Sequence, residues 1–217
     1  RNGYFRGSAT YTLVPGKKNP KKASVLYDVQ TGPAYLLDSI ELLPDTTHLF
    51  HVIDSVARRN PYLVRGERYC TDSLNMVRTV IANSVRNRGY YFFRPEYIEY
   101  LADSLINPGH ISLRLTVASN IPAWSLRRYR VGEITTRVYR NDGGGTPDTM
   151  ETDHGTVIQM RPSRLRRNLI PGCVTFREGR VFSVRDMNRT QTYLSRLGIF
   201  NSINIDVLPD TVNRNSD

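Results

Sequence analysis

The stretch "GRVFSVRDMNRTQTYLSRLGIFNSINIDV" (179–207) begins with a glycine and an aromatic residue, continues as a helix-like run, and ends in alternating apolar residues. An earlier stretch, "GERYCTDSLNMVRTVIANSVRNRGYYFF" (66–93), has a similar order. The chain opens with "RNGYF", which resembles the end of that earlier stretch. A pattern repeated in this way predicts repeated architecture, so we interpret the chain as tandem copies of one structural unit.

The middle copy is complete and predicts the order β-α-α-β-β. "AYLLDSIELL" (34–43) is rich in strand formers, and a helix capped by Thr46 or Thr47 follows it. A second helix has Leu74, Val77, Ile81 and Val85 on one stripe and a glycine at its end. "YYFFRPEYIEYL" (90–101) is extended and contains a proline, which favours an edge strand, and "HISLRLTVA" (110–118) alternates with a period of two.

The flanking segments predict two further, partial copies. "SATYTLV" and "ASVLYDV" are two strands that end a preceding unit, which gives a first domain at 1–33 and a middle domain at 34–120. The third domain spans 125–217, with a first strand at 129–141, a flexible polar insertion "DGGGTPDTMETDHG" (142–155) and a short first helix at 161–172. Its second helix spans 183–198, where Ser183 and Asp186 suit a capping box, and a strand follows at 199–207. We expect the central strand of this sheet to come after Asp217.

Composition limits the class of protein. The chain has 217 residues, of which 39% are hydrophobic and 23% charged, and this is typical of folded domains. It contains no apolar run long enough for a membrane-spanning helix, and no signal peptide is visible in the opening "RNGYFRGSAT". That opening is typical of the interior of a longer protein.

The net charge of +10 permits binding to nucleic acid, anionic lipid or acidic protein. All four lysines lie in "KKNPKK" (17–22), and every other basic side chain is arginine. A solvated arginine-rich surface explains the same charge without any partner. The densest basic cluster comprises Arg161, Arg164, Arg166, Arg167, Arg177, Arg180, Arg185 and Arg189.

The sequence points to no catalytic, cofactor or metal site. His48 and His51 share a helical face near Asp54, but no third ligand converges on them, and His110 and His154 are isolated. There is no nucleophile elbow and no phosphate-binding glycine loop, so a hydrolase is disfavoured. The two cysteines, Cys70 and Cys173, form neither a zinc motif nor a disulfide framework, although a single bridge between them stays possible on sequence alone.

These repeats resemble the POTRA (polypeptide-transport-associated) domains of BamA- and TamA-type outer membrane proteins. The family pattern is a glycine, an aromatic residue near the second helix, and "GYF" or "LG-F" leading into a strand. It is met by Gly66, Tyr69 and "GYYF" (89–92), and again by Gly179, Phe182 and "LGIF" (197–200). "GYYFFRPEYIEYLADS" with "RRYRVGEI" is similar to the version in Bacteroidetes homologues.

The resemblance implies an α+β fold of tandem β-α-α-β-β units, each with a three-stranded mixed sheet covered by two helices, its second strand at an edge and its third in the middle. It also implies a non-enzymatic periplasmic arm that continues into a transmembrane β-barrel. Its partners would be unfolded outer membrane proteins or accessory assembly proteins. Under this interpretation the arginine cluster lies in the unit nearest the barrel, where it could meet anionic lipid headgroups or an acidic partner.

An edge strand can accept an extended polypeptide through main-chain hydrogen bonds, with little demand on sequence. We expect the binding edges to follow three glycines, although packing of these aromatic residues under the helices is the alternative for each. The predicted residues are Tyr4, Phe5, Tyr90, Tyr91, Phe92, Phe93, Phe200, Ile203 and Ile205. The rival function is a basic nucleic-acid-binding module, although no recognised nucleic-acid motif accompanies the arginines.

Overall fold

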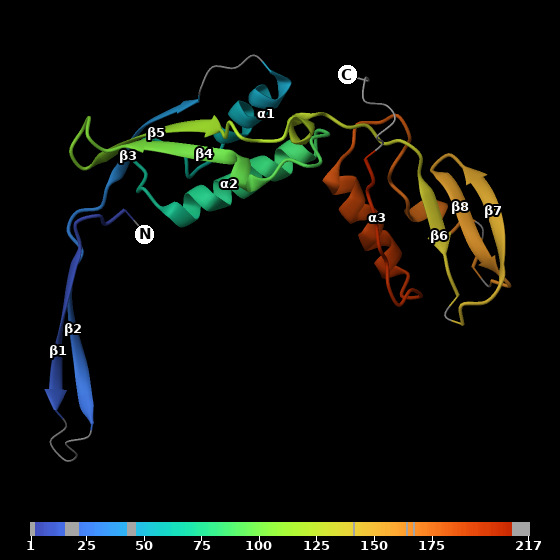
Figure 1. The fold of residues 1–217 in the computed structure, drawn as a ribbon, viewed down its shortest axis with the longest axis horizontal. Coiled ribbons are helices and arrows are strands. Elements are labelled where there is room, and N and C mark those ends of the chain that lie inside the picture. The colour runs from blue at the N-terminus through green and yellow to red at the C-terminus, as the bar shows by residue number, and fades with distance from the viewer. Residues whose placement is uncertain are drawn as a thin grey trace. The chain divides into compact units, whose positions relative to one another are not determined.

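The computed structural model describes residues 3–15, 22–42, 47–140, 142–163, 165–166 and 168–209. The chain divides into unit 1, which holds residues 1–81 and 94–120, and unit 2, which holds residues 82–93 and 121–217. The described residues form one two-stranded sheet, two three-stranded sheets and three α-helices (Figure 1). The predicted α+β class with three-stranded mixed sheets is therefore confirmed.

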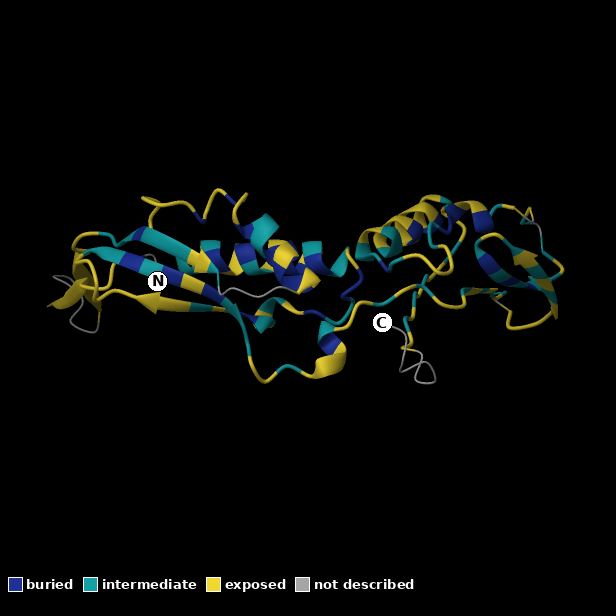
Figure 2. Cartoon of the chain, turned by 90° about the horizontal axis from the view of Figure 1, so that it is seen from above, coloured by how far each residue is buried: buried dark blue, intermediate teal, exposed yellow. Residues whose placement is uncertain are grey.

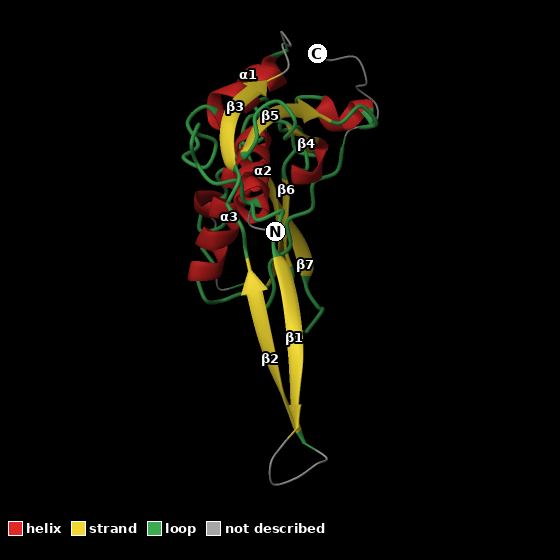
Figure 3. Cartoon of the chain, turned by 90° about the vertical axis from the view of Figure 1, so that its left-hand side faces the viewer, coloured by secondary structure: helices red, strands yellow, loops and turns green. Residues whose placement is uncertain are grey.

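The first two strands form an exposed antiparallel hairpin. β1 (Ser8–Pro15) pairs with β2 (Ala23–Gln30), and every residue of both strands is exposed (Figures 2 and 3). Ala9 lies opposite Val29 and Tyr11 opposite Tyr27, so apolar side chains gather on one face because alternate residues share a face. The two predicted strands are confirmed, whereas most of the lysine-rich loop between them (16–21) lies outside the described residues.

Unit 1 contains the predicted β-α-α-β-β arrangement. The elements are β3 (Leu36–Leu42), α1 (His48–Ala57), α2 (Thr71–Arg86), β4 (Ile98–Asp103) and β5 (His110–Val117), and the end of α2 belongs to unit 2. The strand order is β3-β5-β4, with β5 parallel to β3 and antiparallel to β4. The third strand of the repeat is therefore central and the second lies at an edge, as predicted.

The core of unit 1 follows from the two periodicities in the sequence. On β5, Ile111, Leu113 and Leu115 are buried at every second position, and the intervening residues are partly or fully exposed. The stripe of α2 that begins with Leu74 and Val77 is buried as predicted. The hydroxyl of Thr47 accepts a hydrogen bond from the backbone N–H of Phe50, so Thr47 caps α1.

The structure corrects the predicted edge strand at residues 90–94. This segment is a turn, and β4 begins only at Ile98, after the 3-10 helix η1 (Pro95–Tyr97). Tyr90 is 5% exposed and Phe93 is 1% exposed, so their aromatic character reflects burial and not a strand. Pro95 lacks a backbone N–H and occupies the start of η1, where no hydrogen-bond donor is needed.

Unit 2 contains a three-stranded sheet of which the sequence predicted the first strand, within residues 129–141, but not the other two. β6 (Thr135–Val138), β7 (Thr146–Thr152) and β8 (Gly155–Arg161) are arranged in the order β6-β8-β7, with β8 parallel to β6 and antiparallel to β7. The segment predicted as a flexible insertion is therefore β7 and the start of β8. Met150 packs against the core of the unit, and Asp148 forms an ion pair with Arg161 at 2.8 Å, so tertiary contacts override the polar composition.

The rest of unit 2 departs from the prediction at three places. No α-helix forms over the described part of 161–172, which ends in the 3-10 helix η3 (Pro171–Cys173). Residues 199–207 are assigned to no strand, although Phe200 and Ile203 contact the core. Because β8 supplies the central strand, the reason for expecting a central strand after Asp217 no longer holds. The predicted second helix is confirmed as α3 (Val184–Arg196).

Candidate functional site

β4 is an exposed edge of the sheet in unit 1. It pairs with β5 on one side, from Ile98 opposite Val117 to Asp103 opposite Ser112, and with no strand on its other side among the described residues. Alternate residues of an antiparallel strand direct their N–H and C=O groups toward opposite sides. Half of the backbone groups of β4 therefore face the open edge and are available to an additional strand.

Side chains hold β4 firmly against the helix beneath it. Ile98 is fully buried, and the Tyr100 hydroxyl donates a hydrogen bond to the backbone C=O of Leu74 on α2 at 3.3 Å. The Arg78 guanidinium lies 5.1 Å from the centre of the Tyr100 ring. Burial raises the pKa of Tyr100 to about 12, although the nearby charge of Arg78 opposes the rise. The edge is thus rigidly positioned while Leu101, which is 53% exposed, faces solvent.

The other sheet edges are less suitable for strand addition. The outer side of β3 is partly covered, because Leu37 N–H donates to Glu67 C=O at 2.7 Å and Gly66 N–H donates to Leu37 C=O at 2.7 Å. β7 contains Pro147, which has no N–H to donate. β6 has four residues, against six in β4. Among the edges of the two three-stranded sheets, β4 therefore offers the most complete set of backbone donors and acceptors in the described residues.

The aromatic residues near Gly3 belong to a network that we call the N-terminal clamp, defined by Gly3, Tyr35 and Tyr69. Tyr35 N–H donates to Gly3 C=O at 2.9 Å, and Tyr69 N–H donates to Tyr35 C=O at 2.9 Å. The ring of Phe5 lies 5.1 Å from that of Tyr35 and 5.5 Å from that of Tyr69. Tyr4 and Phe5 precede β1 and lie outside any strand, so the predicted edge is not formed there.

The residues near Gly89 form an equivalent network, the C-terminal clamp, defined by Gly89, Tyr129 and Phe182. Tyr129 N–H donates to Gly89 C=O at 2.8 Å, and Phe182 N–H donates to Tyr129 C=O at 3.1 Å. The Phe92 ring lies 5.4 Å from that of Tyr129, and the Tyr91 ring lies 4.9 Å from that of Phe182. The aromatic residues that we predicted as a binding edge therefore hold this clamp together.

Both clamps need a glycine at their centre. Gly3 and Gly89 have φ angles of +80° and +103°, which L-residues rarely adopt. A Cβ atom on Gly3 would lie 2.6 Å from the Tyr69 carbonyl oxygen, and one on Gly89 would lie 2.9 Å from Val181 Cγ1. Close contacts therefore explain the motif glycine at positions 3 and 89, whereas a Cβ atom on Gly198 would meet nothing within 4 Å.

The last group of predicted edge residues lies in unit 2 after α3. Phe200 and Ile203 pack partly against the core cluster formed by Val157, Ile170, Cys173 and Leu194. Ile205 is partly exposed and extends the same alternation. These side chains cover the core, and residues 199–207 are not in a hydrogen-bonded ladder in the described part of the chain.

The structure separates the predicted arginine cluster. Arg161 is paired with Asp148, whereas Arg166, Arg177 and Arg180 are exposed. Arg164 and Arg167 lie outside the described residues. Arg185 and Arg189 lie on α3, together with Arg196, which we did not include. The spacing 185, 189, 196 places all three on one helical face and could have identified Arg196.

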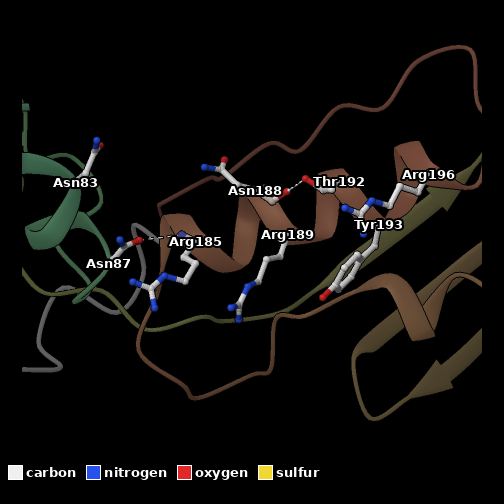
Figure 4. Close-up of a pocket in the computed structure, with 8 residues that line it drawn as sticks. All are labelled: Asn83, Asn87, Arg185, Asn188, Arg189, Thr192, Tyr193 and Arg196. Carbon is white, nitrogen blue, oxygen red and sulfur yellow. Dashed lines mark hydrogen bonds between the residues drawn. The ribbon is translucent and has the colours of Figure 1, made fainter. Parts of the chain in front are cut away.

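The arginine face of α3 borders a hollow of about 550 Å³ (Figure 4). Its lining consists of Asn83, Asn87, Arg185, Asn188, Arg189, Thr192, Tyr193 and Arg196. Asn87 Oδ1 accepts a hydrogen bond from Arg185 N–H at 2.8 Å, so Asn87 caps α3. The predicted capping box is therefore wrong, since Ser183 makes no side-chain capping bond and lies 3.5 Å from the same Asn87 oxygen.

No group of three or more potential metal ligands occurs among the residues that the structure describes. Both cysteines are free; Cys70 is partly exposed and Cys173 is buried. Hydrogen bonds from Ser73 lower the pKa of the Cys70 thiol, whereas burial raises the pKa of Cys173. Within the described chain, no helix is long and apolar enough to cross a bilayer.

Comparison with known proteins gives matches in structure but not in sequence. No protein-family model matches the chain, and no curated protein matches it. A crystal structure of POTRA domains 3–5 of BamA from Haemophilus influenzae matches with a TM-score of 0.52 and 14% identity. The match covers 97% of this chain and 69% of that one.

Two further solved structures resemble the chain more distantly. POTRA domains 1–3 of the periplasmic domain of Omp85 from Anabaena match with a TM-score of 0.31 and 16% identity, over 97% of this chain and 71% of that one. CdiB from Acinetobacter baumannii matches with a TM-score of 0.25 and 12% identity, over 77% of this chain and 25% of that one. TM-scores this low are not used as support. The match to the BamA structure on its own shows that the chain has the fold of tandem POTRA domains.

Proposed function

We propose that this chain is the periplasmic POTRA region of an outer membrane β-barrel protein that acts in outer membrane protein assembly, insertion or translocation. It binds client or accessory polypeptides by adding their strands to the edge of its own sheets, without catalysis or cofactors. The POTRA fold supports this proposal, and so does the open edge of β4. Continuation into a barrel, and the origin in a Bacteroidetes protein, stay predictions from sequence.

We also propose that the repeats are a partial POTRA domain at 1–33, a complete one at 34–120 and a third at 125–217. The two clamps support this division, because the same hydrogen bonds recur around Gly3 and Gly89. The hairpin of β1 and β2 supports it too, because one of its faces carries exposed apolar residues, as expected of a fragment of a sheet: Tyr11, Leu13, Val25, Tyr27 and Val29.

The observation that carries the proposed function is the chemistry of β4. Glu99, Leu101 and Asp103 share the face that turns away from Ile98 and Tyr100. An incoming strand would obtain its affinity from main-chain hydrogen bonds, and its side chains would meet this mixed acidic and apolar face. We therefore expect a preference for strands that alternate apolar with basic or neutral residues.

Proline scanning of β4 tests the proposal. Leu101 and Ala102 are adjacent, so one turns its N–H toward β5 and the other turns its N–H toward the open edge. We expect one proline variant to unfold unit 1. The other should stay folded and lose binding to a ten-residue strand peptide, measured by fluorescence anisotropy.

The matched control is the same peptide with N-methylated amides, which cannot donate main-chain hydrogen bonds. It should fail to bind the unmodified chain. If the N-methylated peptide bound as well as its parent, or if both proline variants stayed folded and bound normally, strand addition at β4 would be excluded.

A further inference from the structure

The exposed face of α3 is a continuous stripe of hydrogen-bond donors. Arg185, Asn188, Arg189, Thr192, Tyr193 and Arg196 recur at helical spacing and border the hollow. The three arginines extend over about 16 Å of helix. None of them forms an ion pair among the described residues, and the lining of the hollow contains no carboxylate.

Asn83 on α2 and Asn87, which directly follows that helix, complete this surface. Asn83 and Asn87 are one helical turn apart and belong to the lining. The Oδ1 atom of Asn87 is engaged by the backbone N–H of Arg185, which leaves the Nδ2 hydrogens of Asn87 as donors (Figure 4). Guanidinium and amide donors together favour a ligand that has several acceptor oxygens and a negative charge.

The composition of the lining distinguishes among anionic partners. Protein interfaces depend on buried aromatic and apolar anchors, and the lining offers one aromatic side chain, Tyr193, which is 40% exposed. Single-stranded nucleic acid needs several aromatic rings for base stacking. A row of separate arginines instead matches phosphate groups displayed side by side on a surface, because each guanidinium can bind two oxygens of one phosphate.

We infer that the hollow beside α3 binds the phosphate oxyanions of anionic phospholipid headgroups. Arg185 with Asn87 forms one end of this surface and Arg196 forms the other, with Arg189 between them. The site is separate from β4, and its function does not depend on polypeptide binding by that edge.

Flotation with lipid vesicles tests the inference on the full chain. One variant, which we call the groove variant, changes the three arginines that line the hollow: Arg185→Gln, Arg189→Gln and Arg196→Gln. The control variant combines Arg127→Gln, Arg137→Gln and Arg177→Gln, which are exposed arginines of unit 2 outside the hollow. Both variants lose the same charge. We expect the groove variant to bind vesicles containing phosphatidylglycerol about a hundredfold more weakly, and the control less than about tenfold more weakly.

Further measurements distinguish a lipid headgroup from free phosphate as the ligand. Inorganic phosphate should not displace the chain from vesicles, and vesicles of phosphatidylcholine alone should not bind. Unchanged thermal unfolding of unit 2 would show that the groove variant is folded. Equal losses in both variants, displacement by inorganic phosphate, or tighter arginine-dependent binding of a single-stranded oligonucleotide would each overturn the assignment.

Discussion

The sheets β3-β5-β4 and β6-β8-β7 have the same arrangement of strands but a different connection between their first two strands. Each has a central strand that is parallel to the first strand and antiparallel to the other edge. In both units the central strand directly follows its antiparallel edge strand, but two helices connect the first strand to that edge strand in unit 1, and no α-helix does so in the described part of unit 2. The comparison shows that one strand arrangement can be reached by two connections.

The interiors of the two sheets differ more than their topologies. The central strand β5 buries three large aliphatic side chains, Ile111, Leu113 and Leu115. The central strand β8 buries one, Val157, and a polar residue, Gln159, which hydrogen-bonds to Ser163. Two helices thus give unit 1 an apolar core that the sheet of unit 2 does not match, so we expect unit 1 to be the more stable.

Truncation of the central strands should give the largest effect. Leu113 is 1% exposed, and Leu113→Ala should lower the free energy of unfolding of unit 1 by about 4 kcal/mol. Val157→Ala in unit 2 should cost about 2 kcal/mol, since fewer buried atoms are removed. Hydrogen exchange at amides of β5 and β8 during denaturant titration separates the two. An equal cost in both units would show that their cores are equivalent.

Substitution of the clamp glycine should come next. Gly89→Ala should cost about 3 kcal/mol, because it combines an unfavourable φ with contacts below 3.0 Å. Gly179 also has a positive φ of +74°, but a Cβ there meets nothing within 4 Å. Gly179→Ala should therefore cost only about 1 kcal/mol. Similar unfolding midpoints for the two variants would contradict the role of close contact in the clamp.

The pH dependence of stability should distinguish the edge strands. The folded-state pKa of Tyr100 is raised by burial to about 12, so its contribution is present below about pH 10. It should be lost as the pH rises from about 10 to 12, to an extent on the order of 2 kcal/mol. In the other edge strand, β7, the residue opposite the buried Val157 of the central strand is Met150, whose side chain has no titratable group.

Tyr100→Phe should flatten the curve for unit 1 over this range, measured as the denaturant midpoint at each pH. Burial also raises the pKa of Tyr90 in unit 2, against the opposing charge of Arg128, so a weaker dependence should persist there. A curve for unit 1 that is unchanged by Tyr100→Phe would remove Tyr100 as its source.

The cap of α3 should give the smallest effect. Asn87→Ala removes the acceptor for Arg185 N–H and should lower the free energy of unfolding of unit 2 by about 1 kcal/mol. Asn83→Ala is the matched control, since it also lines the hollow but has no described bond to α3. Thermal unfolding of both variants tests this, and an equal loss in both would show that the hydrogen bond from the Arg185 backbone N–H is not the source.

The sequence predicted unit 1 well, because its periodicities are strong and agree with its caps. Leu74, Val77 and Ile81 are buried as the helical stripe requires, and Thr47 caps α1 as expected. The run Tyr90–Phe93 was misread because aromatic residues favour strands but also pack in turns, and only the fold shows that Tyr129 and Phe182 lie beside Phe92 and Tyr91.

The strands β7 and β8 of unit 2 were missed for a physical reason, whereas β6 lies within the predicted strand at 129–141. Glycine, proline and aspartate disfavour strands, and β7 forms because β8 pairs with it along its whole length. An edge strand was predicted at this point of the repeat, but the prediction began at residue 90, whereas β4 begins at Ile98. The hollow could not be predicted as a whole, because Asn83 and Asn87 are remote in sequence from the arginines that they join.

Asn87 and Gly89 also bear on how such a chain can be shortened or duplicated. They lie in the middle copy of the repeat but belong to the compact unit that contains α3 and Phe182. The boundaries of the sequence repeat therefore do not coincide with the boundaries of the compact units. A protein cut between Asn120 and Ile121 would lose a helix cap and a clamp, whereas one beginning near Thr71 would keep both. Recombination between repeats would be tolerated best where residues 82–93, with the end of α2, are kept together with the domain that follows them.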